Sequence, residues 1–235
     1  MSRGILIALL SLSLPVTGNG DTEPVPIAYE VVAVDGRLLL EVEPEPQRLH
    51  PGDRPVSGDR LRTGSSSAAT IGAPSHTAVF RLDSKTTCTL AHDRPGVLLH
   101  VERGRLRAMF GSYTGTDPRL VTTPSAVLAV RGTDYGLKVK KNGDTRLVVF
   151  EGVVEAIDPT GRRPPVRIEG GQQTRIRTGR AAEAPKPHRL TPNDWDRGFD
   201  APGAGMGTNG AMPGGPSSAP GAGQRSGSGS KRRGG

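Results

Sequence analysis

Short apolar runs, each ended within a few residues by Gly, Pro or Asp, fill the sequence between residues 27 and 178. Within these runs apolar and polar residues alternate with a period of two, which places successive side chains on opposite faces of a strand. No stretch of this region offers an apolar face of helical spacing for longer than two turns. Short runs at intervals of roughly 8–12 residues are typical of an all-β domain, so we expect many short strands here.

The architecture of this all-β domain stays open between a β-solenoid, a sandwich and a barrel. Aromatic residues make up only 3% of the chain, so the core must be aliphatic, and a thin stack of Val and Leu suits a solenoid slightly better than a barrel. Asp35-Gly36 between two runs predicts a hairpin, and Lys138, Lys140 and Lys141 suggest a protected sheet edge. Breaks between strands are expected at three further sites, residues 103–104, 132–133 and 151–152.

Residues 1–20 have the layout of a secretory signal peptide. Arg3 provides the positive start, a largely apolar run without charge follows over residues 4–16, and a helix breaker with small residues comes next. The alternative is an uncleaved anchor, but a spanning helix needs about 20 apolar residues and this run is too short. We therefore expect export to the periplasm or beyond, with cleavage between Gly18 and Asp21 and no membrane span afterwards.

The composition changes sharply after residue 200. Residues 201–235 contain 12 Gly and 4 Pro but no acid, no aromatic and no Val, Ile or Leu. Such a segment buries too little apolar surface to offset chain entropy, so we expect a disordered basic tail after a linker over residues 179–200. The tail carries +4 and Arg3 adds +1 to a formal net charge of +8, which leaves +3 for residues 21–200. The strong basicity is thus largely a property of the chain ends.

Cys88 is the only cysteine, which excludes both an internal disulfide and a metal site of several cysteines. It lies in a β-type run, and we interpret it as a small buried or half-buried side chain. A catalytic thiol is disfavoured because no local Cys/His signature accompanies it, whereas pairing between two chains stays open.

No catalytic, cofactor-binding or metal site is expected from the sequence. The five His show no metal-ligand spacing, and neither a Gly-x-Ser-x-Gly elbow nor a phosphate loop occurs in the β region. Glu41, Glu43 and Glu45 alternate at strand spacing, which would place three carboxylates on one face. Pro44 and Pro46 interrupt that strand, so we expect a solvated acidic edge rather than a cation site.

Nucleic acid is not the expected partner. One Trp, three Tyr and four Phe offer few platforms for base stacking. Trp195 stands between Asp194 and Asp196, which would repel phosphate, so we expect it to pack the linker onto the domain. Three basic residues of the tail, 231–233, suit contact with lipid headgroups or acidic glycans, although a solubilising role is the simpler interpretation.

Six motifs follow one another in a fixed order. They are residues 58–64 (GDRLRTG), 80–82 (FRL), 101–106 (VERGRL), 123–135 (TPSAVLAVRGTDY), 148–154 (VVFEGVV) and 170–172 (GGQ). The Thr-Pro…Val-Arg-Gly-Thr segment is the most specific, and the Glu-Gly-Val piece is weak alone. In this order they resemble the FecR domain family, and we assign residues 27–178 to a FecR-like domain.

The resemblance implies a periplasmic all-β domain. In the best-known members of the family, the domain sits behind a membrane helix and a cytoplasmic anti-sigma segment. It relays the state of an outer-membrane iron–siderophore receptor to an extracytoplasmic-function sigma factor. Only three residues precede the apolar run here, so we expect no cytoplasmic anti-sigma segment, and the chain looks like the stand-alone, exported members of the family.

The residues of the family motifs have a structural interpretation. The glycines fall between apolar runs, where a positive φ or a close backbone approach is tolerated only by Gly, and Asp59 is expected to cap its turn with Arg60 or Arg131 as a partner. The full set is Gly58, Asp59, Arg60, Thr63, Gly64, Gly104, Thr123, Pro124, Arg131, Gly132, Thr133, Glu151 and Gly152.

Three hypotheses for function follow. The first is a non-catalytic binding or signalling module of the cell envelope that acts through protein partners and needs no cofactor. The second is a protein that binds the cell wall or a glycan, aided by the basic tail. The third, a hydrolase with an unrecognised site, lacks any acid, base or nucleophile group in the motifs.

Overall fold

The structure is a computed structural model that describes residues 27–91, 95–112 and 118–197. All of these residues fall within the first of two compact units of the chain, Met1–Ala204. The expected signal peptide (1–20) and basic tail (201–235) lie outside the described residues, as does the whole second unit, Gly205–Gly235.

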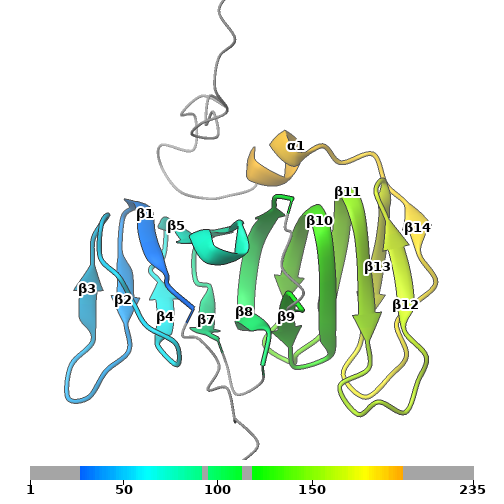
Figure 1. The fold of residues 1–235 in the computed structure, drawn as a ribbon, viewed down its shortest axis with the longest axis horizontal. Coiled ribbons are helices and arrows are strands. Elements are labelled where there is room, and N and C mark those ends of the chain that lie inside the picture. The colour runs from blue at the N-terminus through cyan, green and yellow to red at the C-terminus, as the bar shows by residue number, and fades with distance from the viewer. Residues whose placement is uncertain (1–26, 92–94, 113–117, 198–235) are drawn as a thin grey trace, which may run out of the picture. The chain divides into compact units, whose positions relative to one another are not determined.

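Strands dominate the described residues, which confirms the all-β prediction (Figure 1). The strands are β1 (Glu30–Asp35), β2 (Leu38–Leu40), β3 (Gln47–Leu49), β4 (Arg60–Thr63), β5 (Ala68–Ala73), β6 (Ala78–Leu82), β7 (Thr87–Leu90), β8 (Val97–Phe110), β9 (Leu120–Thr123), β10 (Ala126–Val139), β11 (Thr145–Ile157), β12 (Val166–Glu169), β13 (Gln172–Ile176) and β14 (Lys186–Pro187). A 3₁₀ turn follows β5 at Pro74–His76, and one short helix, α1 (Pro192–Arg197), ends the described part of the chain.

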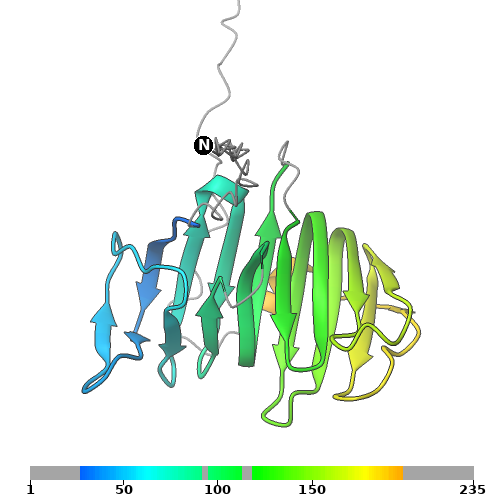
Figure 2. The same ribbon diagram turned by 60° about the horizontal axis from the view of Figure 1, so that its bottom comes forward.

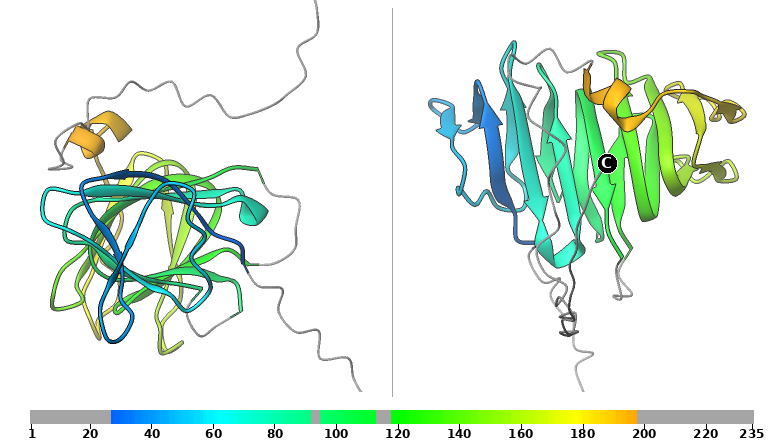
Figure 3. Two further views of the ribbon diagram at one scale, coloured as in Figure 1. Left: turned by 90° about the vertical axis from the view of Figure 1, so that its left-hand side faces the viewer. Right: turned by 90° about the horizontal axis from the view of Figure 1, so that it is seen from above.

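The 14 strands form one continuous sheet that folds over into two layers sharing β8, β10 and β11. Layer A has the order β1-β5-β6-β8-β10-β11-β13-β14 and uses the C-terminal halves of β8 and β10 with the N-terminal half of β11. Layer B has the order β3-β2-β4-β7-β8-β9-β10-β11-β12 and uses the other halves. Seen end on, the strands enclose a central core (Figure 3, left).

The pairing pattern separates this fold from a solenoid. Among the described strands every pairing is antiparallel except that of β8 with β9. A β-solenoid stacks similar repeats on one another, whereas here hairpin-like neighbours and two layers build a sandwich-like roll. Of the architectures left open by the sequence, the layered one therefore describes this chain.

The three long strands, β8, β10 and β11, cross the middle of the domain (Figure 2). Each has one glycine of positive φ where it passes between the layers: Gly104 in β8, Gly132 in β10 and Gly152 in β11. In β10 the buried positions are even-numbered up to Val130 and, apart from Gly136, odd-numbered from Thr133 onward, and the register with β11 shifts between these points. One inserted residue turns the following side chains to the other face of a strand. The prediction of breaks between strands at these glycines is wrong, because the strands continue through them.

Two further predictions from local patterns, a hairpin at Asp35-Gly36 and a protected sheet edge at Lys138, are also wrong. The Asp35-Gly36 turn joins β1 to β2, but β1 pairs with β5 and β2 pairs with β3 and β4, so the turn links the two layers instead of closing a hairpin. Lys138 does not guard an edge, since β10 is hydrogen-bonded on both sides at that point. Local signals identified the turns, but pairing partners depend on distant strands.

The core is mainly aliphatic and lies between the layers. Its largest fully buried side chains include Leu38, Leu61, Ile71, Leu82, Leu90, Leu98, Leu99, Leu106, Leu128 and Leu137. Aromatic residues contribute one cluster, in which Phe110 meets Phe80 edge-on and stacks on Tyr135 with ring centroids 6.1 Å apart. Three aromatic side chains thus meet where β6, β8 and β10 pack together, and Phe150 and Trp195 form a separate pair with ring centroids 6.2 Å apart.

Residues after β13, expected to be a linker, pair and pack with layer A. β14 pairs with β13, and α1 lies on the outer face of the layer (Figures 1 and 3). Trp195 is buried there, and its indole nitrogen donates a hydrogen bond to the Leu106 carbonyl at 3.1 Å. Asp196 pairs with Arg107 and Arg81 at 2.7 and 3.1 Å. The expected packing of Trp195 onto the domain is what the structure shows.

Candidate functional site: a basic cavity across the strands

Six basic side chains lie in register across the strands. In layer B, Arg62 of β4 and Arg103 of β8 face the same β7 residue, Thr87, from its two sides. Beyond the bend of β8, cross-strand partners in layer A continue the series with Arg105, Lys138, Arg146 and Arg175 on β8, β10, β11 and β13. Directly paired residues point to the same side of a sheet. We call Arg62, Arg103, Arg105, Lys138, Arg146 and Arg175 the basic row.

A cavity of about 810 Å³ opens along the first part of the basic row. Its lining comprises Arg37, Leu39, Arg62, Thr63, Gly64, Ser65, Asp83, Ser84, Lys85, Arg103, Gly104, Arg105, Lys138, Val139, Lys140 and Lys141. Eight of these residues are basic and one, Asp83, is acidic. The buried members Thr63, Gly64, Asp83 and Val139 form its floor, and most of the basic side chains are exposed around it. We call this space the basic cavity.

A smaller space of about 250 Å³ continues the same surface. It shares Lys138 and Lys140 with the basic cavity and adds Arg146, Arg175 and Arg177, with Asp144 as its one acidic residue. Neighbouring strands lie about 4.8 Å apart, so the four cations from Arg105 to Arg175 extend over roughly 14 Å. The two cavities therefore form one elongated, positively charged depression.

Acids within the chain neutralise only part of this charge. Arg62 bonds Glu41 at 2.8 Å, and Arg105 lies 3.7 Å from Asp83. Arg146 donates both of its bonds to the neutral amide oxygen of Gln173, and its pKa is lowered by burial and by the nearby positive charge of Arg175. Several cations make no ion pair within the described residues: Arg37, Lys85, Lys138, Lys140, Lys141 and Arg175. The depression carries a net positive charge.

Three of the motif residues singled out in the sequence line the basic cavity: Thr63, Gly64 and Gly104. The Thr63 hydroxyl donates to the Asp83 carbonyl at 2.5 Å and accepts from the Thr86 amide at 2.9 Å. A Cβ on residue 104 would lie 2.4 Å from the Thr86 Cα, so Gly lets β8 bend closely past β7 at the cavity wall. These motif residues shape the cavity, whereas its charge comes from the arginines and lysines of the lining.

Arg60 and Asp59 belong to a separate network. Arg60 forms a two-bond fork with Glu102 at 2.6 Å and also pairs with Glu41, which raises the Arg60 pKa through the hydrogen bond to Glu102. The same bond lowers the pKa of Glu102. Asp59 instead accepts the Val56 amide at 2.8 Å and caps its turn. The expected pairing of Arg60 with Asp59 is replaced by carboxylates from β8 and from the chain after β2.

Most of the remaining motif residues lie at the β9–β10 turn and at the strand bends. Thr123 accepts the Ala126 amide at 3.0 Å and joins Ser125 and Thr145 in a buried hydroxyl network next to Pro124. Gly132, Thr133 and Gly152 meet where β10 and β11 bend. Arg131 and Glu151 are exposed beside this bend. The most specific family motif, residues 123–135, therefore forms the β9–β10 turn and the first part of β10 through its bend.

No catalytic group assembles from the side chains that the structure describes. Cys88 is fully buried in β7, and burial raises the pKa of its thiol to about 12, so it is neither a nucleophile nor accessible to a second chain. Within residues 27–91, 95–112 and 118–197, no group of three or more His, Cys, Asp and Glu is placed to hold a metal ion. None of the described helices is long and apolar enough to cross a membrane.

Sequence reasoning missed the basic row. Its members are separated by up to 113 positions along the chain, from Arg62 to Arg175, and lie in five strands. The net charge of +3 for residues 21–200 concealed them, because acids elsewhere in the domain balance the sum. The signal present in the sequence was a basic residue near the middle or end of successive predicted strands, but it becomes a row only when the register is known.

The fold first defines a class: an all-β domain in which three long strands cross between two layers. The family model described as FecR protein matches residues 59–155. This match confirms the resemblance to the FecR family over these residues. The matched region contains Thr63, Gly64, Gly104 and four members of the basic row after Arg62: Arg103, Arg105, Lys138 and Arg146.

Comparison with solved structures found two crystal structures, at 2.50 and 1.65 Å resolution, of a candidate anti-sigma factor from Parabacteroides distasonis ATCC 8503. Each shares 17% sequence identity with this chain at a TM-score of 0.46, and the match covers 55% of this chain. The chain spans 59% of the length of that protein. No curated protein matches the sequence.

Proposed function

We propose that this chain is an exported, non-catalytic FecR-type domain that acts as a signalling or binding module of the cell envelope through a protein partner. The observation that carries the proposal is the basic cavity: a concave, positively charged surface on a rigid sheet scaffold, with eight basic residues and one acid in its lining. Concave surfaces with concentrated charge of one sign focus the field on a partner of opposite sign.

The chemistry of the cavity supports recognition in preference to catalysis. Its only acid, Asp83, is buried and already engaged by Arg105 and by the Ser84 amide. A hydrolytic reaction needs a nucleophile or a general base within hydrogen-bond reach of the substrate, and the lining supplies hydroxyls and cations without a paired base. The regulatory character of FecR domains, implied by the resemblance, agrees with this assignment.

Location in the periplasm or outside the cell is part of the proposal. It is supported by the signal-like layout of residues 1–20, in which Arg3 precedes an apolar run. The single cysteine, without a partner for an internal disulfide, is compatible with export.

A role in binding cell-wall polymers or glycans is the second candidate. The positive charge of the cavity favours it, since many wall polymers are anionic. The lining of the cavity contains no aromatic ring, however, and aromatic faces are what sugar rings usually stack on. The protein partner is therefore the better-supported candidate.

Chemical cross-linking of the full-length protein in envelope fractions, followed by affinity capture, tests the proposal. We expect one specific envelope protein to be recovered from cells, and we expect fractionation to place the chain outside the cytoplasm. Cytoplasmic location, or recovery of no specific protein under several growth conditions, would contradict it. Sedimentation with purified cell wall, with and without residues 201–235, tests the second candidate, and a pellet in either form would favour it.

A further inference from the structure

We propose that the basic row seats an extended acidic segment of the partner protein, which lies across the strands with its carboxylates on the row. This inference rests on the proposed function and adds the chemistry of the contact. The acidic segment would bind mainly in the basic cavity and continue into the smaller space around Arg146 and Arg175.

Charge complementarity is the first argument. Lys138 and Arg175 are exposed strand residues, and Lys138 stands between Arg105 and Arg146 in the register. Like charges on directly paired strand positions are destabilising unless an opposite charge comes between them. A carboxylate from outside the domain would reduce the repulsion between these neighbouring cations. An arginine side chain can bind such a carboxylate through two parallel hydrogen bonds.

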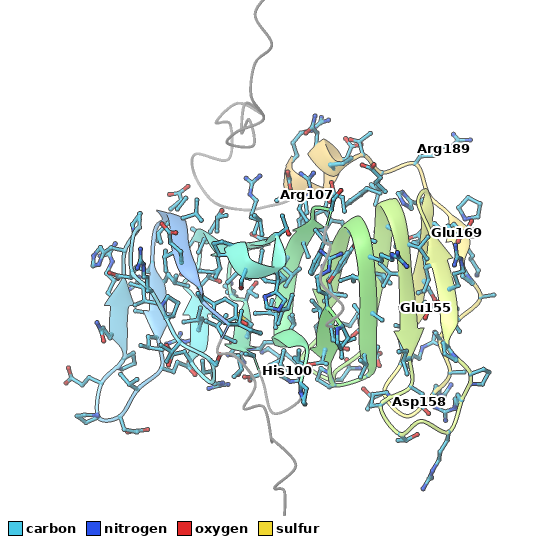
Figure 4. The ribbon with its side chains drawn as sticks, viewed as in Figure 1. His100, Arg107, Glu155, Asp158, Glu169 and Arg189 are labelled. Atoms are coloured by element: carbon cyan, nitrogen blue, oxygen red, sulfur yellow. The ribbon has the colours of Figure 1, made fainter. Side chains whose placement is uncertain are left out.

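The chain itself supplies the second argument on the neighbouring row of the same face. Arg81 of β6 and Arg107 of β8 are directly paired. Arg107 lies two residues after Arg105 in β8, on the same face of the sheet. A segment of the chain, α1, crosses this row from outside, and its Asp196 bonds both arginines (Figure 4 labels Arg107 below α1). The outer face of layer A therefore already binds one carboxylate of a crossing segment in this manner. The basic row offers the same kind of seat with most of its cations lacking an acidic partner.

Other occupants fit less well. The tail cannot be the occupant, because residues 201–235 carry +4 and no acid. The lining has no aromatic ring on which a nucleic-acid base would stack. A membrane surface is flat, whereas the cations here surround a depression of about 810 Å³. Carboxylates on a narrow, flexible chain match both the shape and the charge.

The length of the row sets the size of the segment. An extended peptide rises about 3.3 Å per residue, so the roughly 14 Å between Arg105 and Arg175 correspond to four or five residues. A fluorescein-labelled peptide of about eight glutamates therefore covers this part of the row and reaches the basic cavity.

Fluorescence anisotropy of this peptide with the full-length protein is the direct test. The row variant carries Lys138→Glu and Arg175→Glu, and the control variant carries Arg167→Glu and Arg189→Glu, exposed residues outside both cavities (Figure 4 labels Arg189). Both variants change the net charge equally and keep the basic tail. We expect affinity to fall at least about tenfold in the row variant and by less than about twofold in the control, with binding weakened by salt.

Circular dichroism and thermal melting of both variants establish that each is folded before binding is measured. A second variant, Lys138→Gln with Arg175→Gln, should show a smaller loss than the charge reversal if the contact is electrostatic. Equal losses in the row and control variants would overturn the proposal, because they would show attraction to net charge alone. Tighter binding of single-stranded DNA or of anionic vesicles than of the peptide at the same row would also overturn it.

Cross-linking with envelope fractions separates this inference from the proposed function. Capture of the partner by wild type and control but not by the row variant would support both. Equal capture by all three proteins would refute the acidic seat and leave the proposed function standing. Capture by none of them would contradict the proposed function itself.

Discussion

Trp195 occupies the space that Gly136 leaves open on the outer face of layer A. A Cβ on residue 136 would lie 2.5 Å from the indole ring, closer than carbon atoms pack. The indole nitrogen also bonds the Leu106 carbonyl at 3.1 Å, and Arg105 lies 4.7 Å from the ring centroid. A glycine in the middle of a central strand thus determines where the last described helix packs.

Gly136→Ala should displace Trp195 and destabilise the protein by about 1–3 kcal/mol, the usual cost of overpacking. Trp195 is the only tryptophan, so its fluorescence emission should shift to the red as the ring becomes exposed to water. Gly72→Ala is the matched control in another strand of layer A, because a Cβ there would meet its nearest atom at 3.4 Å. An unchanged emission spectrum in Gly136→Ala would contradict the assigned packing.

The bend of β11 predicts a difference between two glycine substitutions. Gly152 has a φ of +79°, and a Cβ there would lie 2.2 Å from the Gly132 carbonyl oxygen, whereas Gly171 has a φ of +81° with no atom within 4 Å. Gly171→Ala should therefore cost only the left-handed backbone strain of about 1–2 kcal/mol. Gly152→Ala must also move the backbone of β10, so it should cost clearly more in urea denaturation. Equal losses would argue against the close approach of the two bends.

Two buried tyrosines should respond differently to removal of the hydroxyl. Tyr29 donates to the Leu98 carbonyl at 2.7 Å, whereas the buried Tyr135 hydroxyl has no hydrogen-bond partner among residues 27–91, 95–112 and 118–197. Tyr29→Phe should lower the free energy of unfolding by about 1 kcal/mol, since it leaves a carbonyl unpaired. Tyr135→Phe should be neutral or stabilising by up to about 1 kcal/mol, because burial of an unpaired hydroxyl is costly. A loss in Tyr135→Phe as large as in Tyr29→Phe would reveal a partner for that hydroxyl.

The Arg60–Glu102 fork predicts a dependence of stability on pH. The hydrogen bond from Arg60 lowers the Glu102 pKa below its ordinary value of 4.5, so the ionised form is favoured in the folded state. Its contribution is fully present above about pH 4.5 and is lost as the pH falls through the lowered pKa. Glu102→Gln should therefore melt below wild type at pH 7, and the difference in Tm should shrink as the pH falls below 4.5. A difference that stays constant down to pH 3 would contradict the ion pair as its cause.

Much of the local structure was accessible from the sequence. The period-two runs between residues 27 and 178 indicated an all-β domain of many short strands, which the structure shows. The short strands β3, β4 and β9 were missed, since turn-forming residues or Thr dominate their surroundings. The glycines were recognised as special, but whether a glycine ends a strand or bends it depends on whether the next strand continues the pairing. At residues 104, 132 and 152 the pairing continues.

The candidate site was also predicted only in part from the sequence. Thr63, Gly64 and Gly104 were found through the family motifs, and they do line the basic cavity. Its cations were not recognised as a site, because Lys138 was interpreted as an edge guard, and Arg62, Arg103 and Arg105 stood in family motifs without an assigned role. The net charge of a domain does not reveal the sign of a local surface. The electric field at a partner depends instead on how the charges are distributed.

The sequence alone determined what is local or additive: the all-β class, several of the turn positions, the resemblance to FecR domains, the lack of a second cysteine and the basic character of the chain ends. Only the tertiary structure decided that three strands cross between layers, that Trp195 packs on Gly136, and that Arg62, Lys138 and Arg175 share one face. The physical reason is register. Strand pairing fixes which residues become neighbours, and pairing is chosen by the burial of distant apolar side chains together, a property that no short window of sequence contains.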